Sequence, residues 1–524
     1  MTAGTNGAHA LMRTLVGAGV DVCFTNPGTS EMHFVAALDD VPEMRAILGL
    51  FEGVVTGAAD GYGRMAGRPA ATLLHLGPGL ANGIANLHNA RRARTPVVNV
   101  IGDHTIDHRR FDAPLQSDIE SLARPVSCWY RSTETLAALA GDTADAVAAA
   151  CSPPAGVATL VVPADLSWAD GAQVAPPAAP RPPATVPADV VELVAKALTG
   201  GEPCVLLLGA TATRVPGLVA GSRVATATGA RLMAETFPAV LERGAEVPPV
   251  ERLAYLGEMV ADQLRGVRHL VLADATTPVS FFAYPGRPGL LVPEGCSVHV
   301  LAAPGDDAVG ALEALAETVG APADAWARQE PARPERPTGA LNPISAAAAI
   351  GALLPEGAVV SDESNTAGIF LPGATAGAPR HDWLCLTGGA IGQGMPVATG
   401  AAVACPDRRV LSLEADGSAM YTLQSLWTQA REGLDVTTVV FNNGSYAILE
   451  LELSRVGAQG AGPLAQAMLE LDNPSLDFVS LARGMGVEAS RATTAEEFTD
   501  QLERALATPG PSLVEAMVGR GLGL

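Results

Sequence analysis

The chain alternates between short apolar runs and segments whose apolar residues recur at helical spacing. In the first hundred residues the short runs are 21–28, 45–51, 71–76 and 96–103. Apolar residues recur at helical spacing in the segments around these runs, which are 9–19, 31–41, 52–67 and 81–94. Strands that alternate with helices in this way predict a parallel sheet covered by helices on both faces.

The same alternation continues to the end of the chain. Buried-strand runs lie at 203–210, 268–274 and 296–303, and again at 358–364, 408–416, 436–443 and 512–518. Two proline-rich stretches, Pro176–Pro187 and Glu330–Gly339, cannot continue a helix or a strand ladder and predict extended linkers. We therefore expect three doubly wound α/β domains at residues 1–170, 188–328 and 340–524. In such sheets ligands bind at the carboxyl ends of the strands.

Composition narrows the class of protein. The 524 residues are 48% hydrophobic, enough for packed cores, and carry a net charge of -22. A chain this acidic is poorly suited to nucleic acid or to an anionic membrane surface. It has no run of 18 apolar residues, and its first residues lack the pattern of a secretory signal. These features predict a cytoplasmic protein that acts on a small molecule.

Two residue types exclude further chemistry. Lys196 is the only lysine, and it lies in a segment with the pattern of a surface helix. A phosphate-binding P-loop and a lysine Schiff base are therefore nearly ruled out. The seven cysteines are far apart and form no CxxC pair, which argues against a disulfide framework or a structural zinc site.

The most informative stretch lies in the third segment. Asp416-Gly417-Ser418 ends one apolar strand, and Asn442-Asn443-Gly444-Ser445 ends the next, with one helix between them. Asp416 and Asn443 should therefore meet at one sheet edge, 27 positions apart in sequence. Hard oxygen ligands beside free backbone N–H groups suit Mg²⁺ and a diphosphate. Each motif alone is most simply a turn with a helix cap, but the pair at this spacing favours the metal site.

A second feature is Glu52, which follows a short apolar strand and begins a helix made mainly of small residues. A glutamate at this position can complement the helix dipole. That explanation does not account for its placement among glycines and alanines. This placement predicts a carboxylate in a site from which water is excluded.

These motifs resemble those of thiamine diphosphate (ThDP) enzymes, whose usual GDG followed by NN stands here as ADG (Ala415–Gly417) and NN. The resemblance implies that Glu52 hydrogen-bonds the aminopyrimidine ring and that Asp416, Asn443 and the Ser445 carbonyl bind Mg²⁺. It implies a homodimer or homotetramer with active sites between subunits. It also implies cofactor contacts from Ser364, Asn365, Thr366, Gly389, Gly417, Ser418, Ser445 and Tyr446.

The glycine-rich stretch from Gly388 to Pro396 resembles the loop that bends the cofactor, with Ile391 as the wedge beneath it. A glycine-rich turn with an isoleucine in the core is the competing interpretation, at similar odds.

Polar residues near the reacting carbon come from the first segment. The resemblance to benzoylformate decarboxylase implies catalytic roles for His75, which lies 23 positions after Glu52, and for Thr29 in the NPGTSE turn. His104 and His108 follow the next strand. Their spacing could bind a metal if the segment were helical, but we favour loop histidines near the mouth of the site, with His104 among the catalytic candidates.

The resemblance covers nearly the whole chain and is strongest to acetolactate synthase large subunits and benzoylformate decarboxylase. It implies a decarboxylase or carboligase that acts on 2-oxo acids through a C2-carbanion/enamine intermediate. A non-catalytic subunit with the same fold is a rival, although it would not need Glu52, Asp416 and Asn443. A nicotinamide oxidoreductase is disfavoured because the segment after residue 75 lacks a full phosphate fingerprint. FAD is not expected, since no motif for it is evident. The resemblance does not exclude it, because synthases of the family often bind FAD in the middle domain.

Three departures argue against an authentic acetolactate synthase. Those enzymes carry glutamine where this chain has Asp103, and tryptophan where it has Glu452. They also use a first-domain lysine near the acceptor, which this chain lacks. We therefore expect decarboxylation, or ligation to an aldehyde, to outrun acetolactate formation.

Overall fold

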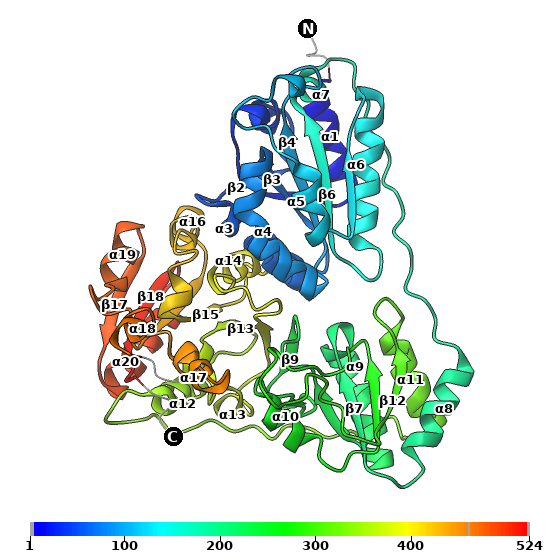
Figure 1. Cartoon of the computed structure of the whole chain (residues 1–524), viewed down its shortest axis with the longest axis vertical. Helices are drawn as coiled ribbons and strands as arrows, with labels where there is room; N and C mark the ends of the chain where they lie inside the picture. The colour runs from blue at the N-terminus through cyan, green and yellow to red at the C-terminus, as the bar shows by residue number, and fades with distance from the viewer. Residues whose placement is uncertain (1–4, 459–461, 521–524) are drawn as a thin grey trace.

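The computed structural model describes residues 5–458 and 462–520 and has three lobes, each built on its own sheet (Figure 1). The first sheet has the order β2-β1-β3-β4-β6-β5, and its strands are parallel. Its strands are β1 (Val22–Asn26), β2 (Arg45–Leu48), β3 (Ala70–His75), β4 (Val97–Asp103), β5 (Trp129–Ser132) and β6 (Val157–Pro163).

Helices cover both faces of this sheet, because alternate strand residues point to opposite sides. Three helices pack on one face: α1 (Gly7–Gly17), α2 (Met32–Ala37) and α6 (Leu136–Cys151). The other face carries α3 (Glu52–Ala66), α4 (Leu76–Ala93) and α5 (Ile119–Ala123). The short α7 (Ala164–Trp168) follows β6. The predicted helix over 31–41 is wrong in detail, since α2 is only six residues long and lies between the 3₁₀ turns Thr29–Glu31 and Leu38–Asp40.

The second sheet is also parallel, with the order β10-β8-β7-β11-β12. Its strands are β7 (Cys204–Leu208), β8 (Arg231–Ala234), β10 (Glu251–Arg252), β11 (His269–Ala273) and β12 (Ser297–Ala302). Its helices are α8 (Ala188–Leu198), α9 (Val215–Thr228), α10 (Gly257–Gln263) and α11 (Ala308–Thr318). Lys196 is exposed on α8, as predicted.

The third sheet has the order β17-β18-β16-β15-β13-β14-β9. Its strands are β13 (Val359–Glu363), β14 (His381–Cys385), β15 (Val410–Ala415), β16 (Val436–Asn442), β17 (Glu488–Ala492) and β18 (Ser512–Met517). The helices are α12 (Pro343–Leu353), α13 (Leu371–Ala374), α14 (Gly394–Ala404), α15 (Asp416–Ala419), α16 (Ser425–Glu432), α17 (Ala447–Arg455), α18 (Pro463–Ala467), α19 (Phe478–Gly484) and α20 (Ala495–Ala507). The three parallel-sheet lobes confirm the predicted fold class.

One edge strand crosses between lobes. The last strand of the third sheet, β9 (Leu241–Arg243), comes from the middle segment and pairs antiparallel with β14. Three residues without apolar alternation give no strand signal in the sequence. The pairing ties the middle segment to the sheet that carries Asp416 and Asn443.

The first and third lobes meet where α3 crosses α14. A Cβ at Gly61 would lie 2.0 Å from the Val397 carbonyl oxygen, and one at Gly400 would lie 1.8 Å from that of Ala58. The two helix backbones are therefore in direct contact, which only glycine permits at these positions.

A buried polar network completes this crossing. Arg64 pairs with Asp60 at 2.6 Å and donates to the Cys385 carbonyl at 2.8 Å and to Thr387 Oγ1 at 3.0 Å. Gln393 Nε2 donates to Asp60 Oδ2 at 2.8 Å. Since each charged group has a partner from the other lobe or from its own helix, the two lobes are fixed in one relative position.

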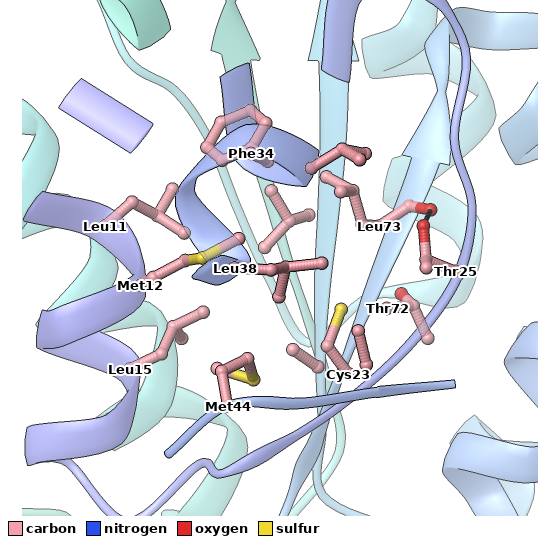
Figure 2. A pocket seen from close by; sticks show the side chains of 14 residues that line it. Leu11, Met12, Leu15, Cys23, Thr25, Phe34, Leu38, Met44, Thr72 and Leu73 are labelled. Carbon is pink, nitrogen blue, oxygen red and sulfur yellow. Dashed lines mark hydrogen bonds between the residues drawn. The ribbon is translucent and has the colours of Figure 1, made fainter. Parts of the chain in front are cut away.

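A small apolar cavity lies on the opposite face of the first sheet, between α1, α2 and the strands (Figure 2). Its volume is about 30 Å³, which is room for about one water molecule. Leu11, Phe34 and Met44 line it, and burial raises the pKa of the nearby Cys23 thiol to about 12. It is therefore a packing defect with an unreactive thiol and not a substrate site.

The helix crossing yields a test of stability. We expect Gly400→Ala to destabilise the protein by about 3 kcal/mol or more, because its Cβ meets backbone that cannot move aside. The matched control is Gly141→Ala in α6, where a Cβ meets no atom within 4 Å; it should be neutral or stabilise by about 0.5–1 kcal/mol. Thermal unfolding checks both variants. Equal melting temperatures for Gly400→Ala and the wild type would show that the helices are not in contact.

Candidate functional site

The site is built where α3 and α4 face the loop before α14. Glu52 is the first residue of α3 and is 9% exposed. Its Oε2 accepts a hydrogen bond from Asn82 Nδ2 at 3.0 Å. The structure therefore places the carboxylate in the largely water-free position that the sequence predicts, although its catalytic role stays a prediction.

Asparagines on one face of α4 connect Glu52 to the glycine-rich loop. Asn86 Nδ2 donates to the Gly53 carbonyl at 2.8 Å and to the Gly392 carbonyl at 3.1 Å. Asn89 Nδ2 donates to the Ala390 carbonyl at 2.8 Å. A single chain thus brings the start of α3 beside this loop. The sequence analysis missed the roles of Asn86 and Asn89, whose signal is the spacing of asparagines 82, 86 and 89 along one helix face.

The loop holds Ile391 away from the core. Gly389 and Gly392 have φ of +75° and +90°, which side chains rarely adopt. Ile391 is half-buried and belongs to no core cluster among the described residues. The interpretation of Ile391 as a core residue is therefore wrong, and the wedge role stays a prediction.

A buried carboxyl pair supports this loop from behind. Glu363 at the end of β13 accepts the backbone N–H groups of Gly392 at 2.7 Å and Gly394 at 2.5 Å. Burial, then the neighbouring Glu363 charge, raises the pKa of Glu414, and burial also raises that of Glu363. Their mutual hydrogen bond further raises the pKa of Glu414 and acts against burial at Glu363, which favours Glu414 as the donor. The sequence analysis missed this pair, whose signal is two acids inside buried apolar strands.

The other end of the site lies at the carboxyl ends of β15 and β16. Asp416 is 2% exposed, and its Oδ2 accepts the backbone N–H groups of Asn443 at 3.0 Å and Gly444 at 2.8 Å. The Asn443 side-chain oxygen accepts the Ser445 N–H at 2.9 Å. The predicted meeting of Asp416 and Asn443 at one sheet edge is therefore observed.

Neighbouring residues of the predicted set gather at the same edge. Asn365, with φ of +49°, donates from Nδ2 to Ser418 Oγ at 2.8 Å, which joins the turn after β13 to the short helix α15 after β15. The Tyr446 ring fills the space in which a side chain at Gly417 would lie. Ser364 and Thr366 flank Asn365 on this turn.

The donor set at this edge fits Mg²⁺. A carboxylate, an amide oxygen and a backbone carbonyl are hard oxygen ligands, and Mg²⁺ completes its shell with phosphate oxygens and water. Among residues 5–458 and 462–520 no group of three or more His, Cys, Asp or Glu side chains could hold a metal. A metal bound here would thus need oxygen atoms from a ligand. Burial raises the pKa of Asp416, while the N–H groups of Gly417, Gly444, Asn443 and Ser445 act to lower it.

His75 stands at the end of β3 and is the N-cap of α4. This helix begins at Leu76, before the helical segment predicted from residue 81. Its Nδ1 lies 2.7 Å from Oε2 of Glu31, a fully buried carboxylate that also accepts the Gly28 N–H at 2.8 Å. This hydrogen bond raises the pKa of His75, burial opposes it, and the charges of Glu31 and Glu52 add to it. Nε2 is then the nitrogen that can face a substrate.

Glu31 is a further residue that the sequence analysis missed. A Cβ at Gly102 would lie 1.7 Å from Glu31 Oε1, so glycine at that position leaves room for the carboxylate. Thr29 is exposed on the same 3₁₀ turn, and Gly28 lies against the His75 ring. Thr29 therefore lies on the turn that contacts His75, and its catalytic role stays a prediction.

His104 follows β4, two residues past Gly102, which pairs with His75 in the sheet register. The segment that joins His104 to His108 is a turn, and the ring centroids are 5.3 Å apart. The helical metal pair is therefore wrong. His104 lies at the same sheet edge as His75, and its catalytic role stays a prediction.

Comparisons with known proteins identify the family to which the chain belongs. The family model for "Thiamine pyrophosphate enzyme, N-terminal TPP binding domain" matches residues 5–123. The model for the C-terminal TPP binding domain of the same family matches residues 373–516. The chain belongs to the thiamine pyrophosphate enzyme family, and thiamine pyrophosphate is another name for ThDP.

Three relatives place it within the family. It is 61% identical, over 98% of this chain and 99% of the relative, to "Putative acetolactate synthase large subunit IlvX" of Mycobacterium tuberculosis. It is 31% identical, over 95% and 96%, to benzoylformate decarboxylase of Pseudomonas aeruginosa. The solved structure of a Rhodococcus jostii ThDP-dependent 4-hydroxybenzoylformate decarboxylase shares the fold, with a TM-score of 0.85, 24% identity and coverage of 99% and 100%. No described helix has both the length and the apolar character needed to span a membrane.

The Glu31–His75 contact makes a prediction about pH. Glu31→Gln should lower the pKa of His75, because the amide removes the charge that favours the imidazolium. Stability that comes from this contact is present below the unfolded pKa of His75, and it is lost as pH rises through the higher folded value.

The His75 ring resonances, followed by NMR against pH, report the shift directly. The exposed Glu43→Gln is the control and should leave the titration unchanged. An unaltered His75 titration in Glu31→Gln would contradict the assigned contact.

Proposed function

We propose that this chain is a ThDP- and Mg²⁺-dependent enzyme that removes CO₂ from 2-oxo acids and releases an aldehyde or joins the remainder to a second carbonyl. The observation that carries the proposal is the contact through Asn86 between the start of α3 and the Gly392 loop. This contact supports a position for Glu52 beside the pyrimidine end of the cofactor.

Each end of the site has its own task. Asp416, Asn443 and the Ser445 carbonyl would hold Mg²⁺. Gly417, Ser418, Tyr446 and the turn at 364–366 would hold the diphosphate. Gly389 and Ile391 would shape the middle of the cofactor. When bound, ThDP supplies a carbon nucleophile that can accept the electron pair left by departing CO₂.

The protein's own residues would move the protons. Glu52 would exchange a proton with the aminopyrimidine ring, and its burial beside Asn82 excludes water that could compete. His75, whose pKa is raised by its hydrogen bond to Glu31, would favour the charged form more than a free imidazole does. It would orient the substrate carboxylate and then give its Nε2 proton to the product carbon. Thr29 and His104 would line the same edge.

The surroundings of the second sheet do not fit FAD. Ligands of such folds bind where the strand order reverses, which here is between the ends of β7 and β11. Asp274 occupies that place: it bonds Arg94 from the first lobe and accepts Thr211 Oγ1 at 2.6 Å. Burial raises the pKa of nearby Glu235. Carboxylates at the phosphate position would repel a dinucleotide, so we propose that the middle domain is structural.

The relatives include a putative acetolactate synthase and a benzoylformate decarboxylase, so two reactions must be distinguished. Decarboxylation is favoured because Asp103 is buried and paired with Arg109 at 2.8 Å, and Glu452 stands where the synthases have tryptophan. The chain also lacks the first-domain lysine that the synthases use near the acceptor. Loss of such a cationic contact to the acceptor carboxylate removes about 1.5–3 kcal/mol of binding free energy. We further propose a homodimer or homotetramer. Because α3 and the Gly392 loop meet within one chain, the residues that a partner subunit would add to the site are others than Glu52.

The test supplies pyruvate and phenylglyoxylate separately, with ThDP and Mg²⁺, with and without FAD. We expect CO₂ and aldehyde to exceed acetolactate, and FAD to have no effect. Acetolactate formation from pyruvate at about 1–10³ per second would refute the assignment and indicate a true synthase. ThDP binding without CO₂ release from any 2-oxo acid would favour the non-catalytic subunit.

A further inference from the structure

The second sheet ends in an edge strand that is paired on one side only. β12 (Ser297–Ala302) pairs with β11, and no other strand of the described chain lies beside it. The opposite edge, β10, lies against the third lobe, because Arg252 of β10 donates to Cys385 Sγ at 3.0 Å. β12 is therefore the edge of this sheet that faces away from the third lobe (Figure 1).

Alternate residues of β12 direct their backbone groups away from β11. Ser297 donates its N–H to the Arg268 carbonyl at 2.8 Å, so its backbone faces β11. Because this pattern alternates along a strand, the backbone of His299 also faces β11, and the N–H and C=O groups of Val298 and Val300 face outward. Outward-facing backbone groups of this kind are a template for one more strand.

The side chains at this edge are apolar and uncovered. Val298 and Val300 are 39% and 51% exposed. They lie beside Leu270 and Leu272 of β11, which belong to a buried core. Residues 274–296 connect β11 to β12 without the helix that usually covers such a parallel pair. The apolar face of the sheet therefore reaches its edge with no crossover helix over it.

The composition of β12 differs from that of the other edge strands in the three described sheets. Each of the others carries at least one charged side chain: Arg45 in β2, Arg131 in β5, Glu251 in β10, Glu488 in β17 and Glu242 in β9. β12 has no Asp, Glu, Lys, Arg or Pro. Charged residues and prolines protect edge strands from pairing with another chain. β12 lacks this protection, which indicates an edge that is covered in the assembled protein.

A second copy of this chain fits the edge. The chain carries a net charge of -22, so two copies repel each other, and an uncharged strand opposes their contact least. An antiparallel pair centred on His299 would place Val298 of each copy opposite Val300 of the other. This register joins the outward-facing backbone groups of both valines and is the same for both copies, as a two-fold axis requires.

The residue at the axis is compatible with this contact. His299 Nε2 lies 3.0 Å from His269 Nδ1. Burial, and then the charge of His269, lowers the pKa of His299. Two copies of His299 would therefore meet as neutral imidazoles at neutral pH, without mutual repulsion.

We propose that β12 is an interface at which a second copy of this chain adds its own β12, antiparallel about a two-fold axis at His299. The second sheets of the two copies then form one continuous sheet. This inference goes beyond the proposed function and does not depend on it, since it assigns a surface and a pairing register to the association of two copies.

The first test measures the molar mass of the full-length protein by sedimentation at micromolar concentration. Val300→Arg places a charge opposite the partner strand, and the exposed position leaves the fold of one chain intact. We expect this variant to have half the molar mass of the wild type and an unchanged circular dichroism spectrum.

Ile344→Arg is the matched control, because Ile344 is 48% exposed on α12 of the third lobe. It should keep the molar mass of the wild type. A monomeric wild type, or equal molar masses for the wild type and Val300→Arg, would overturn the inference.

A second test measures the register. Residues that face each other without backbone bonds in an antiparallel pair have Cα atoms about 4.5 Å apart, which a disulfide can bridge. We expect His299→Cys to form a covalent dimer under mild oxidation. Ser297→Cys would face Leu301 of the other copy and should form no more covalent dimer than the wild type with its native cysteines. No covalent dimer from His299→Cys, or an equal amount from Ser297→Cys, would overturn the assigned pairing.

Discussion

The backbone contact between α3 and α14 is the constraint on which the rest of the site depends. Gly61 and Gly400 let the two helices touch without side chains between them, and the helices start at Glu52 and just after Ile391. Because both starts lie at the same end of the crossing, the carboxylate and the glycine-rich loop are held beside each other. Asn86 then bridges the two through the Gly53 and Gly392 carbonyls.

Buried carboxylates recur around this crossing, and their partners differ. Glu363 accepts backbone N–H groups of the loop, and Glu31 accepts His75. Glu52 accepts an asparagine amide. A buried acid with protein donors fixes geometry. Glu363 therefore holds the glycine-rich loop in place, and Glu31 orients the His75 ring.

The sequence predicts the fold class and the main motifs because each depends on local pattern. Alternating apolar runs predict the parallel sheets, and Asp416 and Asn443 meet because both follow neighbouring strands. The rest depends on contacts between distant segments. Glu31 reaches His75 across 44 positions, and the three-residue β9 joins a sheet more than a hundred positions away in sequence. Neither contact has a periodic signal. The asparagines at 82, 86 and 89 were visible as one helix face, but only the fold shows what that face contacts.

The central claim is that Glu52 acts on a cofactor held by Asp416 and Asn443. The most direct measurement is hydrogen–deuterium exchange at the thiazolium C2 of bound ThDP, with calorimetry to measure cofactor affinity. The account predicts that Glu52→Gln binds ThDP and Mg²⁺ as tightly as the wild type and slows C2 exchange by about 10²-fold or more, whereas Asp416→Ala loses Mg²⁺-dependent binding. Wild-type exchange in Glu52→Gln at saturating cofactor, or unchanged ThDP affinity in Asp416→Ala, would contradict it.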